Sequence, residues 1–203
     1  MKPIKNLLAA FSAALALTAF AAPEVGKPAP AFTLTDLNGQ SHTLASFAGK
    51  TVVLEWVNPE CPFVVKHYEK SGNMPATQKA AVADGVVWIS INSAAPGKQG
   101  DFDKAAAEAW MKRVGAAPSA YCRDVDGKVG KAYDARTTPH MFVIDGKGVL
   151  VYAGGIDDIR SANAEDIAKA TNYVKAALAD LKAGREVQVK TSRPYGCSVK
   201  YAD

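Results

Sequence analysis

The residue of this chain best placed for redox chemistry is Cys61. It follows an apolar run over residues 51–57, which predicts a buried strand, and it precedes Pro62, a residue favoured at the first position of a helix. A thiol at a helix start faces unpaired backbone N–H groups and the positive end of the helix dipole, and both stabilise the thiolate. We therefore expect Cys61 to have a depressed pKa and to act as a nucleophile. The alternative is an inert, buried cysteine.

Charged residues flank Cys61 in the sequence. Lys66 and His67 follow it and would add positive charge that favours the thiolate, whereas Glu60 precedes it and would oppose the thiolate. Glu55 lies inside the apolar run, where an ionised carboxylate is costly unless it is paired. Either Glu55 is buried and exchanges protons near the cysteine, or it lies at a strand edge and points to solvent.

The hydrophobic pattern around these residues predicts alternating strands and helices. Apolar runs predict strands, and helical spacing bounded by Pro or Gly predicts helices. We expect hairpin arms at 32–34 and 41–44, strands at 51–57, 86–91, 120–122, 141–144 and 149–152, and helices at 61–83 with a kink near Pro75, 101–114, 125–133 and 165–181. This order predicts an α/β thioredoxin fold: a mixed central sheet with helices on both faces, an N-terminal β extension and a C-terminal tail.

The N-terminus predicts export. Lys2 and Lys5 precede an uncharged apolar run over residues 7–20, which is short for a membrane span and typical of a signal-peptide core. Small residues at Ala19 and Ala21 place the cleavage site after Ala21. We expect a signal peptide at 1–21, one domain at 22–184 and a tail at 185–203, in a periplasmic or secreted protein. The alternative is a retained membrane anchor.

Composition narrows the class of partner. The formal net charge is +4, of which Lys2 and Lys5 supply two positive charges, so the mature chain is near +2. Such a balanced chain, without a basic run interleaved with aromatic residues, is not expected to bind nucleic acid. No apolar run after the leader is long enough to cross a bilayer, so we expect no membrane contact after signal cleavage.

Several motifs of the chain resemble a known family. These are GKPAPAFTL at 26–34 with Asp36 and Gly39, NPECPFV at 58–64, INS at 91–93, Thr138-Pro139, GIDD at 155–158 and GCSVKY at 196–201. Together they span nearly the whole mature chain and resemble the peroxiredoxin-like branch of the thioredoxin superfamily, within the redoxin group that includes alkyl hydroperoxide reductases and thiol-specific antioxidants. The resemblance implies an exported thiol-dependent oxidoreductase that acts on protein or small-molecule thiols and disulfides.

The resemblance also implies roles for residues around Cys61. In a thioredoxin-like fold, Glu55 lies beneath the active cysteine and exchanges protons with the thiol or with a nearby water. Pro139 would be cis and pack beside Cys61, so that the backbone of Thr138 could hydrogen-bond an extended peptide. The alternative is an ordinary proline at the start of a strand. The expected substrate-binding residues are Asn58, Pro62, Thr138 and Pro139.

The chain departs from the family patterns at three positions. The thioredoxin motif Cys-x-x-Cys ends here in Val64. Peroxiredoxins place a threonine where this chain has Asn58, and an arginine facing the cysteine in the region of Pro139, with Arg136 nearby but not at that position. Disulfide exchange is therefore the first hypothesis, and the alternatives are a weak thiol peroxidase acting on peroxides as an antioxidant, or a non-enzymatic binding or metal-handling module.

Cys197 is the expected resolving thiol for Cys61. From Gly184 the tail can span about 40 Å if extended, enough to fold back to the active site, and Gly196 gives the backbone local freedom. The alternative is a tail that only packs against the domain. Cys122 is expected to be structural, and the alternative is that it serves as the partner of Cys61. We expect no cofactor and no metal site, because Cys61, His67 and His140 make a thin ligand set and His42 lies near a turn.

Overall fold

The computed structural model describes residues 22–202, so the predicted signal peptide at 1–21 lies outside the described residues. Its centre is a five-stranded sheet in the order β5-β4-β3-β7-β8. The strands are β3 (Val52–Trp56), β4 (Val87–Asn92), β5 (Ala120–Arg123), β7 (His140–Ile144) and β8 (Leu150–Gly154). β3, β4 and β5 are parallel, whereas β7 runs antiparallel to both β3 and β8. The predicted mixed sheet is confirmed.

Alternate residues of β3 divide the core between the two faces of the sheet. All five residues of this central strand are buried. Val53 faces one apolar cluster, whereas Leu54 and Trp56 face the other. Because successive strand residues point to opposite faces, Glu55 lies on the same face as Val53. The strand therefore carries its one carboxylate into the cluster that also contains Cys61.

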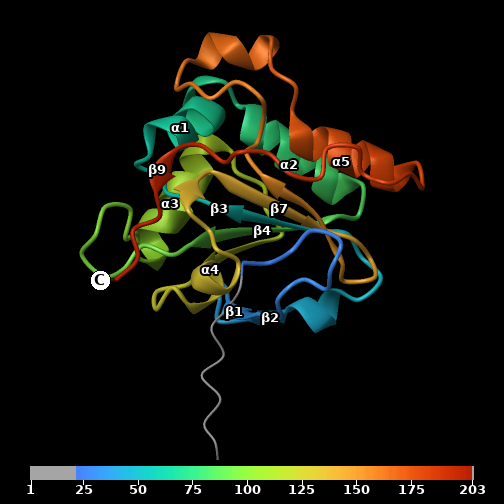
Figure 1. The fold of residues 1–203 in the computed structure, drawn as a ribbon. Coiled ribbons are helices and arrows are strands. Elements are labelled where there is room, and N and C mark those ends of the chain that lie inside the picture. The colour runs from blue at the N-terminus through green and yellow to red at the C-terminus, as the bar shows by residue number, and fades with distance from the viewer. Residues whose placement is uncertain (1–21, 203) are drawn as a thin grey trace, which may run out of the picture.

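Helices cover both faces of the sheet, as Figure 1 shows. The face with Cys61 packs against α1 (Pro62–Val65), α2 (Asn73–Ala83), α3 (Lys104–Val114) and α5 (Tyr173–Lys182). The other face packs against α4 (Lys128–Ala132) and the hairpin of β1 (Thr33–Thr35) and β2 (Ser41–Thr43). A 3₁₀ turn, η1 (Leu44–Phe47), follows β2. This arrangement is the thioredoxin fold with the predicted N-terminal β extension.

The single helix predicted over residues 61–83 is wrong in its interior. A π-helix, η2 (Lys66–Lys70), follows α1, and the chain then turns at Gly72, whose φ is 62°, before α2 begins. The left-handed conformation at Gly72 breaks the helix, because only glycine adopts it without strain. Pro75 lies in the first turn of α2 and causes no kink, since the missing N–H has no partner there.

The last predicted helix, at 165–181, is likewise divided. A 3₁₀ turn, η3 (Ala164–Ala168), is followed by a break, and α5 starts after Asn172. The side chain of Asn172 accepts a hydrogen bond from the backbone N–H of Lys175, which makes it an N-cap. This capping residue starts a new helix where the hydrophobic pattern alone indicated continuity.

The C-terminal tail returns across the domain to Cys61. Figure 1 shows it leaving α5 and reaching β9 (Cys197–Ser198) beside α1. β9 pairs antiparallel with β6 (Thr137–Thr138), so that Thr138 lies opposite Cys197. The tail therefore packs against the segment that precedes β7, close to Cys61.

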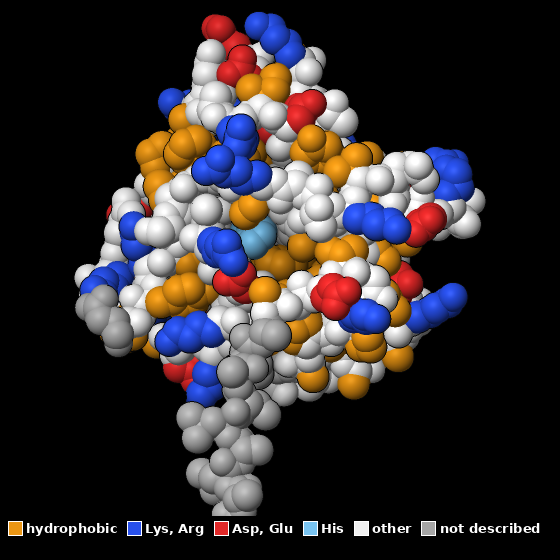
Figure 2. Space-filling view, in the orientation of Figure 1, with side chains coloured by type: hydrophobic (Ala, Val, Ile, Leu, Met, Phe, Trp, Pro, Cys, Tyr) orange, Lys and Arg blue, Asp and Glu red, His pale blue; other side chains and the backbone are white. Residues whose placement is uncertain are grey.

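The surface carries charges of both signs. Figure 2 shows basic and acidic side chains intermingled on the face drawn, with small apolar areas between them. Large hydrophobic side chains that are exposed among the described residues are Val82 and Val189. Within residues 22–202, no helix is both long and apolar enough to span a membrane.

Candidate functional site

Cys61 occupies the N-cap position of α1 and is completely buried, with 0% of its surface exposed. Its Sγ donates a hydrogen bond to the carbonyl oxygen of Thr138 over 3.0 Å. The backbone N–H of Cys197 points at the same Sγ from 3.5 Å. The sulfur is thus enclosed by the helix start, the segment before β7 and the returning tail.

The pKa of the Cys61 thiol is lowered, in the direction expected from its place at a helix start. Burial raises this pKa, but the neighbouring side chains of Cys197 and Thr138 and the backbone at Cys197 and Val64 lower it by more. The hydroxyl of Thr138 is buried and has no hydrogen-bond partner among the described residues, so it is free to donate to a thiolate. Backbone N–H groups at the helix start stabilise the anion in the same way.

Cys197 differs from Cys61 in both exposure and proton affinity. It is half-buried, and burial together with the neighbouring Cys61 raises its pKa to about 11. The thiol of Cys197 therefore holds its proton beside Cys61, whose sulfur carries the negative charge more readily. The two neighbouring thiols thus have pKa values shifted in opposite directions.

The segment Thr138-Pro139 lies against Cys61 as predicted. The peptide bond between these residues is cis. Gly196 crosses so close to Thr138 that a Cβ atom at Gly196 would collide with the Thr138 carbonyl oxygen. Gly196 also has a φ of 138°, a conformation that favours glycine. The backbone edge expected to bind an extended peptide is thus occupied by the protein's own tail.

Glu55 is buried and saturated with hydrogen bonds, which excludes the solvent-facing alternative. Burial raises its pKa. Its Oε1 accepts from the hydroxyl of Tyr68 over 2.7 Å, and its Oε2 accepts from Trp88 over 2.8 Å, Gln78 over 2.9 Å and Ser90 over 3.0 Å. These four donors join β3 to η2, α2 and β4, and none of them is Cys61.

Asn58 and Pro62 lie on either side of Cys61 in the sequence, but neither side chain makes a hydrogen bond to its sulfur. The side chain of Asn58 accepts from the N–H of Glu60 over 2.9 Å and donates to the carbonyl of Gln99 over 3.1 Å. Its backbone carbonyl accepts from the N–H of Cys61 over 3.0 Å. Asn58 therefore shapes the turn before Cys61, whereas Pro62 is exposed at the helix start.

A buried polar cluster anchors the tail behind the two cysteines. It consists of Lys66 and His67 from η2, Asp157 from the loop after β8, and Tyr195 from the tail, each at most 7% exposed. Tyr195 donates to Asp157 Oδ1 over 2.6 Å, and Lys66 Nζ lies 3.9 Å from Asp157 Oδ2. The ammonium group of Lys66 also lies 5.7 Å from the centre of the Tyr195 ring, so the loop, η2 and the tail are held together.

His67 is neutral in this cluster, so the prediction that it adds positive charge near Cys61 is wrong. Burial, with a smaller effect of Lys66, lowers its pKa to about 3. Asn73 Nδ2 lies 3.0 Å from His67 Nδ1 and donates to it, which leaves Nε2 to donate to the Tyr195 hydroxyl 3.1 Å away. The neutral ring therefore links Asn73 to Tyr195 through hydrogen bonds and contributes no positive charge.

Other candidates from the sequence lie apart from Cys61. Cys122 is buried, and burial raises its pKa to about 12. Arg136 is exposed and paired with Asp134 over 2.5 Å. His140 is buried in β7, where its pKa falls to about 4, and His42 is hydrogen-bonded to Asp36. Within residues 22–202, no group of three His, Cys, Asp or Glu side chains is placed to hold a metal ion.

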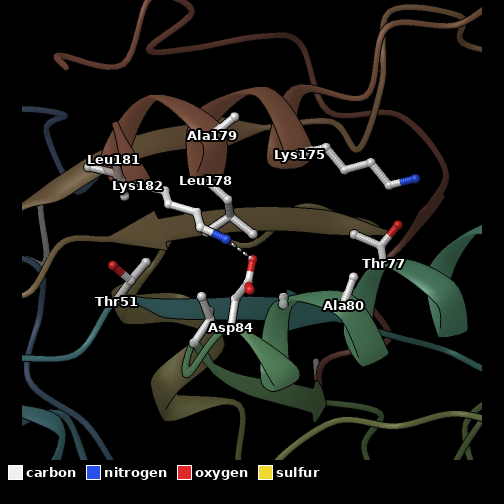
Figure 3. A pocket seen from close by; sticks show the side chains of 11 residues that line it. Thr51, Thr77, Ala80, Asp84, Lys175, Leu178, Ala179, Leu181 and Lys182 are labelled. Atoms are coloured by element: carbon white, nitrogen blue, oxygen red, sulfur yellow. Dashed lines mark hydrogen bonds and ion pairs between the residues drawn. The ribbon is translucent and has the colours of Figure 1, made fainter. Parts of the chain in front are cut away.

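A separate hollow of about 380 Å³ lies between α2 and α5. Figure 3 shows Leu178 extending from α5 toward α2, and an ion pair between Lys182 and Asp84 that links the two helices. Its lining includes neither Cys61 nor Cys197, so it is not part of the thiol site.

Known proteins share this architecture. A sequence model of the Redoxin family matches residues 24–171. The methylamine utilization protein MauD of Paracoccus versutus is 24% identical over 164 residues, which cover 81% of this chain and 74% of that protein. An uncharacterized conserved protein from Geobacillus kaustophilus superposes with a TM-score of 0.74 at 28% identity, over 91% of this chain and 94% of that one.

A fold-level likeness extends to a protein of named activity. The thioredoxin domain of a thiol-disulfide oxidoreductase from Bacteroides vulgatus superposes with a TM-score of 0.51 at 21% identity, over 72% of this chain and 96% of that domain. This likeness shows the fold.

Sequence reasoning missed the cluster of Lys66, His67, Asp157 and Tyr195. A lysine and a histidine side by side in a helix ordinarily indicate a solvated surface. The signal that could have found the cluster was the position of Asp157 and Tyr195 within or next to the motifs at 155–158 and 196–201. Two such motifs, far apart in sequence, indicate that their polar residues meet in the fold.

Proposed function

Because the chain belongs to the redoxin family, whose model matches residues 24–171, we propose that it is a thiol-disulfide oxidoreductase in which Cys61 and Cys197 are the redox pair. Cys61 is the low-pKa sulfur, and Cys197 replaces the second cysteine of the Cys-x-x-Cys motif that this chain lacks. In the oxidised form the two sulfurs share a disulfide. In the reduced form Cys61 carries the negative charge and Cys197 the proton. The substrates are thiols and disulfides of proteins or small molecules.

The observation that carries this proposal is the contact of Cys61 with the tail. Its Sγ lies 3.5 Å from the backbone nitrogen of Cys197, and the neighbouring Cys197 thiol helps to lower its pKa. A disulfide needs two sulfurs that can approach within about 2 Å on adjoining backbones. The pairing of Thr138 with Cys197 holds the tail at that place.

The proposed part of Glu55 is to position Cys61. Its carboxylate accepts hydrogen bonds from Tyr68, Gln78 and Trp88 and so fixes β3. This strand leads directly into the turn before Cys61. Direct proton exchange between Glu55 and the thiol stays a prediction, which would require a water between the two groups.

Peroxide reduction is the weaker alternative for this site. The residue three positions before Cys61, Asn58, uses its side chain to hold Glu60 and Gln99. Arg136 is exposed and pairs with Asp134. A peroxide at Cys61 would therefore lack the threonine and arginine that peroxiredoxins supply. Disulfide exchange needs only the two sulfurs.

The proposed compartment is outside the cytoplasm. It is supported by the basic and apolar N-terminal sequence with small residues at Ala19 and Ala21. An exported location permits stable disulfides, which suits a protein whose reaction forms one.

The proposal is tested by exchange between glutathione and a peptide disulfide. We expect Cys61→Ser to abolish catalysis and Cys197→Ser to reduce it at least tenfold, whereas Cys122→Ser should retain it, because Cys122 is buried with a raised pKa. Full activity in Cys61→Ser would refute the proposal. Rapid peroxide consumption with no exchange activity would favour the peroxidase alternative.

A further inference from the structure

We infer that the sulfur which meets the external substrate is that of Cys197, so that the mixed disulfide with substrate forms on the docked tail while Cys61 is the leaving group. This inference rests on the proposed redox pair and assigns the order in which its disulfide bonds form and break. The alternative is that the tail leaves and the substrate reaches Cys61.

The first support is the difference in access between the two sulfurs. Cys61 is 0% exposed, enclosed by α1, Thr138 and the tail. Cys197 is half-buried, at the surface end of the same pair. Attack on a disulfide sulfur requires the thiolate to approach along the line of the S–S bond, so the accessible sulfur is attacked. In the docked protein, that sulfur belongs to Cys197.

The second support is how firmly the tail is held before Cys197. Ser192 Oγ accepts from the N–H of Gly155 over 2.9 Å, and shares a hydrogen bond of 2.7 Å with the hydroxyl of Tyr152. Tyr195 is tied to Asp157 over 2.6 Å. These contacts fix the chain on the side of Cys197 that leads back to α5.

The tail is held after Cys197 as well. The N–H of Val199 donates to the carbonyl of Arg136 over 3.0 Å, and the N–H of Ala95 donates to the carbonyl of Lys200 over 2.7 Å. The hydroxyl of Tyr201 donates to the carbonyl of Ala135 over 2.8 Å. To expose Cys61, a substrate would have to break contacts on both sides of Cys197, whereas Cys197 is already partly exposed while the tail is docked.

The atoms and electrons of the step balance as follows. An external thiolate attacks Cys197 Sγ, a new S–S bond forms to the substrate, and the Cys61–Cys197 bond breaks with its electron pair on Cys61. A second substrate thiolate then attacks the substrate sulfur of the mixed disulfide and expels Cys197, which takes a proton. The substrate dithiol is oxidised to a disulfide, and the protein disulfide is reduced to two thiols. The lowered pKa of Cys61 makes it the better leaving group.

The test follows glutathione on the full-length protein carrying Cys122→Ser, which leaves two thiols. The protein is first oxidised, and its intact mass should show the loss of two hydrogen atoms. If no such disulfide forms, the proposed redox pair is refuted at this step, before glutathione is added. The oxidised protein is then mixed with reduced glutathione, quenched in acid within the first turnover, digested and mapped.

We expect the trapped glutathione on Cys197, with Cys61 free, in at least tenfold excess over the opposite adduct. Glutathione on Cys61 in equal or greater amount would overturn the inference, as would reduction without any trapped adduct on Cys197.

Gly196→Ala supplies a second readout. A Cβ there would collide with the carbonyl of Thr138, and the φ of 138° disfavours alanine, so the tail should detach and the adduct should shift toward Cys61. Gly184→Ala is the matched control, because Gly184 also has a positive φ, of 67°, but has nothing within 4 Å of its Cβ position. It should keep the preference for Cys197. An unchanged preference in Gly196→Ala would contradict the role of docking.

Discussion

The backbone N–H of Cys197 lies 3.5 Å from the sulfur of Cys61, although the two residues are 136 positions apart in the sequence. This contact places a second thiol beside the thiol at the start of α1 without a Cys-x-x-Cys motif. Because Cys197 lies on a strand of only two residues, Cys197–Ser198, the proposed redox pair depends on how the tail is anchored.

The ionisation of Cys61 should depend on its hydrogen-bond donors. We expect its thiolate absorbance near 240 nm to titrate with a midpoint below the ordinary value of 9.0, and Thr138→Val and Cys197→Ala each to raise that midpoint. The Cys122→Ser background serves as control, since the pKa of Cys122 is raised to about 12. A Cys61 that titrates at 9 or above in the wild-type protein would contradict the thiolate assignment.

Tyr195→Phe should loosen the tail. It removes the hydrogen bond to Asp157 and the contact with His67, and it leaves a buried carboxylate with fewer partners. The expected loss in the free energy of unfolding is about 1–3 kcal/mol, and Cys61 should react faster with iodoacetamide. Amide hydrogen exchange of residues 191–201 measures the release of the tail directly.

The matched control is Tyr173→Phe, which removes a hydroxyl outside this cluster. Its amide exchange and its Cys61 reactivity should be those of the wild-type protein. Equal protection of the tail in Tyr195→Phe and the wild type would show that the cluster does not anchor it.

Glu55→Gln should destabilise the fold more than it alters the chemistry of Cys61. Its carboxylate accepts from four donors, among them Tyr68 and Trp88, and an amide would present an N–H group to some of them. Leaving buried donors unpaired costs about 1–3 kcal/mol, measurable by urea unfolding. The titration midpoint of Cys61 should shift little, because no hydrogen bond joins it to Glu55. A large shift would instead favour the predicted proton exchange.

His67 should make the protein less stable in mild acid. The folded state holds it neutral, with a pKa of about 3 against an ordinary value of 6.5. The unfolded chain binds a proton below pH 6.5 and the folded chain does not, so this contribution is complete above pH 6.5 and is lost as pH falls toward 3. Its size is on the order of a few kcal/mol, and buried Asp157, whose pKa is raised, partly offsets it.

Urea unfolding at pH 4.5 and pH 7 measures this effect. A His67→Gln protein should show a smaller loss between the two pH values than the wild type. An equal loss in His67→Gln would assign the acid sensitivity to other groups.

Much of the fold and of the Cys61 environment could be predicted because the signals are local. The apolar run at 51–57 specifies β3, and the Pro after Cys61 specifies a helix start. The cis peptide at Pro139 followed from its place before β7 in a thioredoxin-like order, not from its own residue type. The helix boundary at Gly72 was missed although Ser71-Gly72-Asn73 is a turn signal, and the boundary at Asn172 was missed because apolar residues lie on both sides of it.

The remainder of the site could not be predicted because it depends on long-range contacts of very short segments. β9 and β6 have two residues each, Cys197–Ser198 and Thr137–Thr138, too few for any periodic pattern. The burial of Lys66 and His67 depends on Asp157 and Tyr195, which come from two other segments. Such a polar cluster is stable only once all its members are assembled, so no single stretch of sequence reveals it.

The central claim is most directly tested by mapping the cysteines at redox equilibrium. The full-length protein is equilibrated over a range of glutathione potentials, alkylated and analysed by mass spectrometry, with Cys197→Ser as control. The structure predicts one cooperative two-electron transition in which Cys61 and Cys197 become cross-linked while Cys122 stays reduced. Free thiols at both Cys61 and Cys197 under the most oxidising condition would contradict the account.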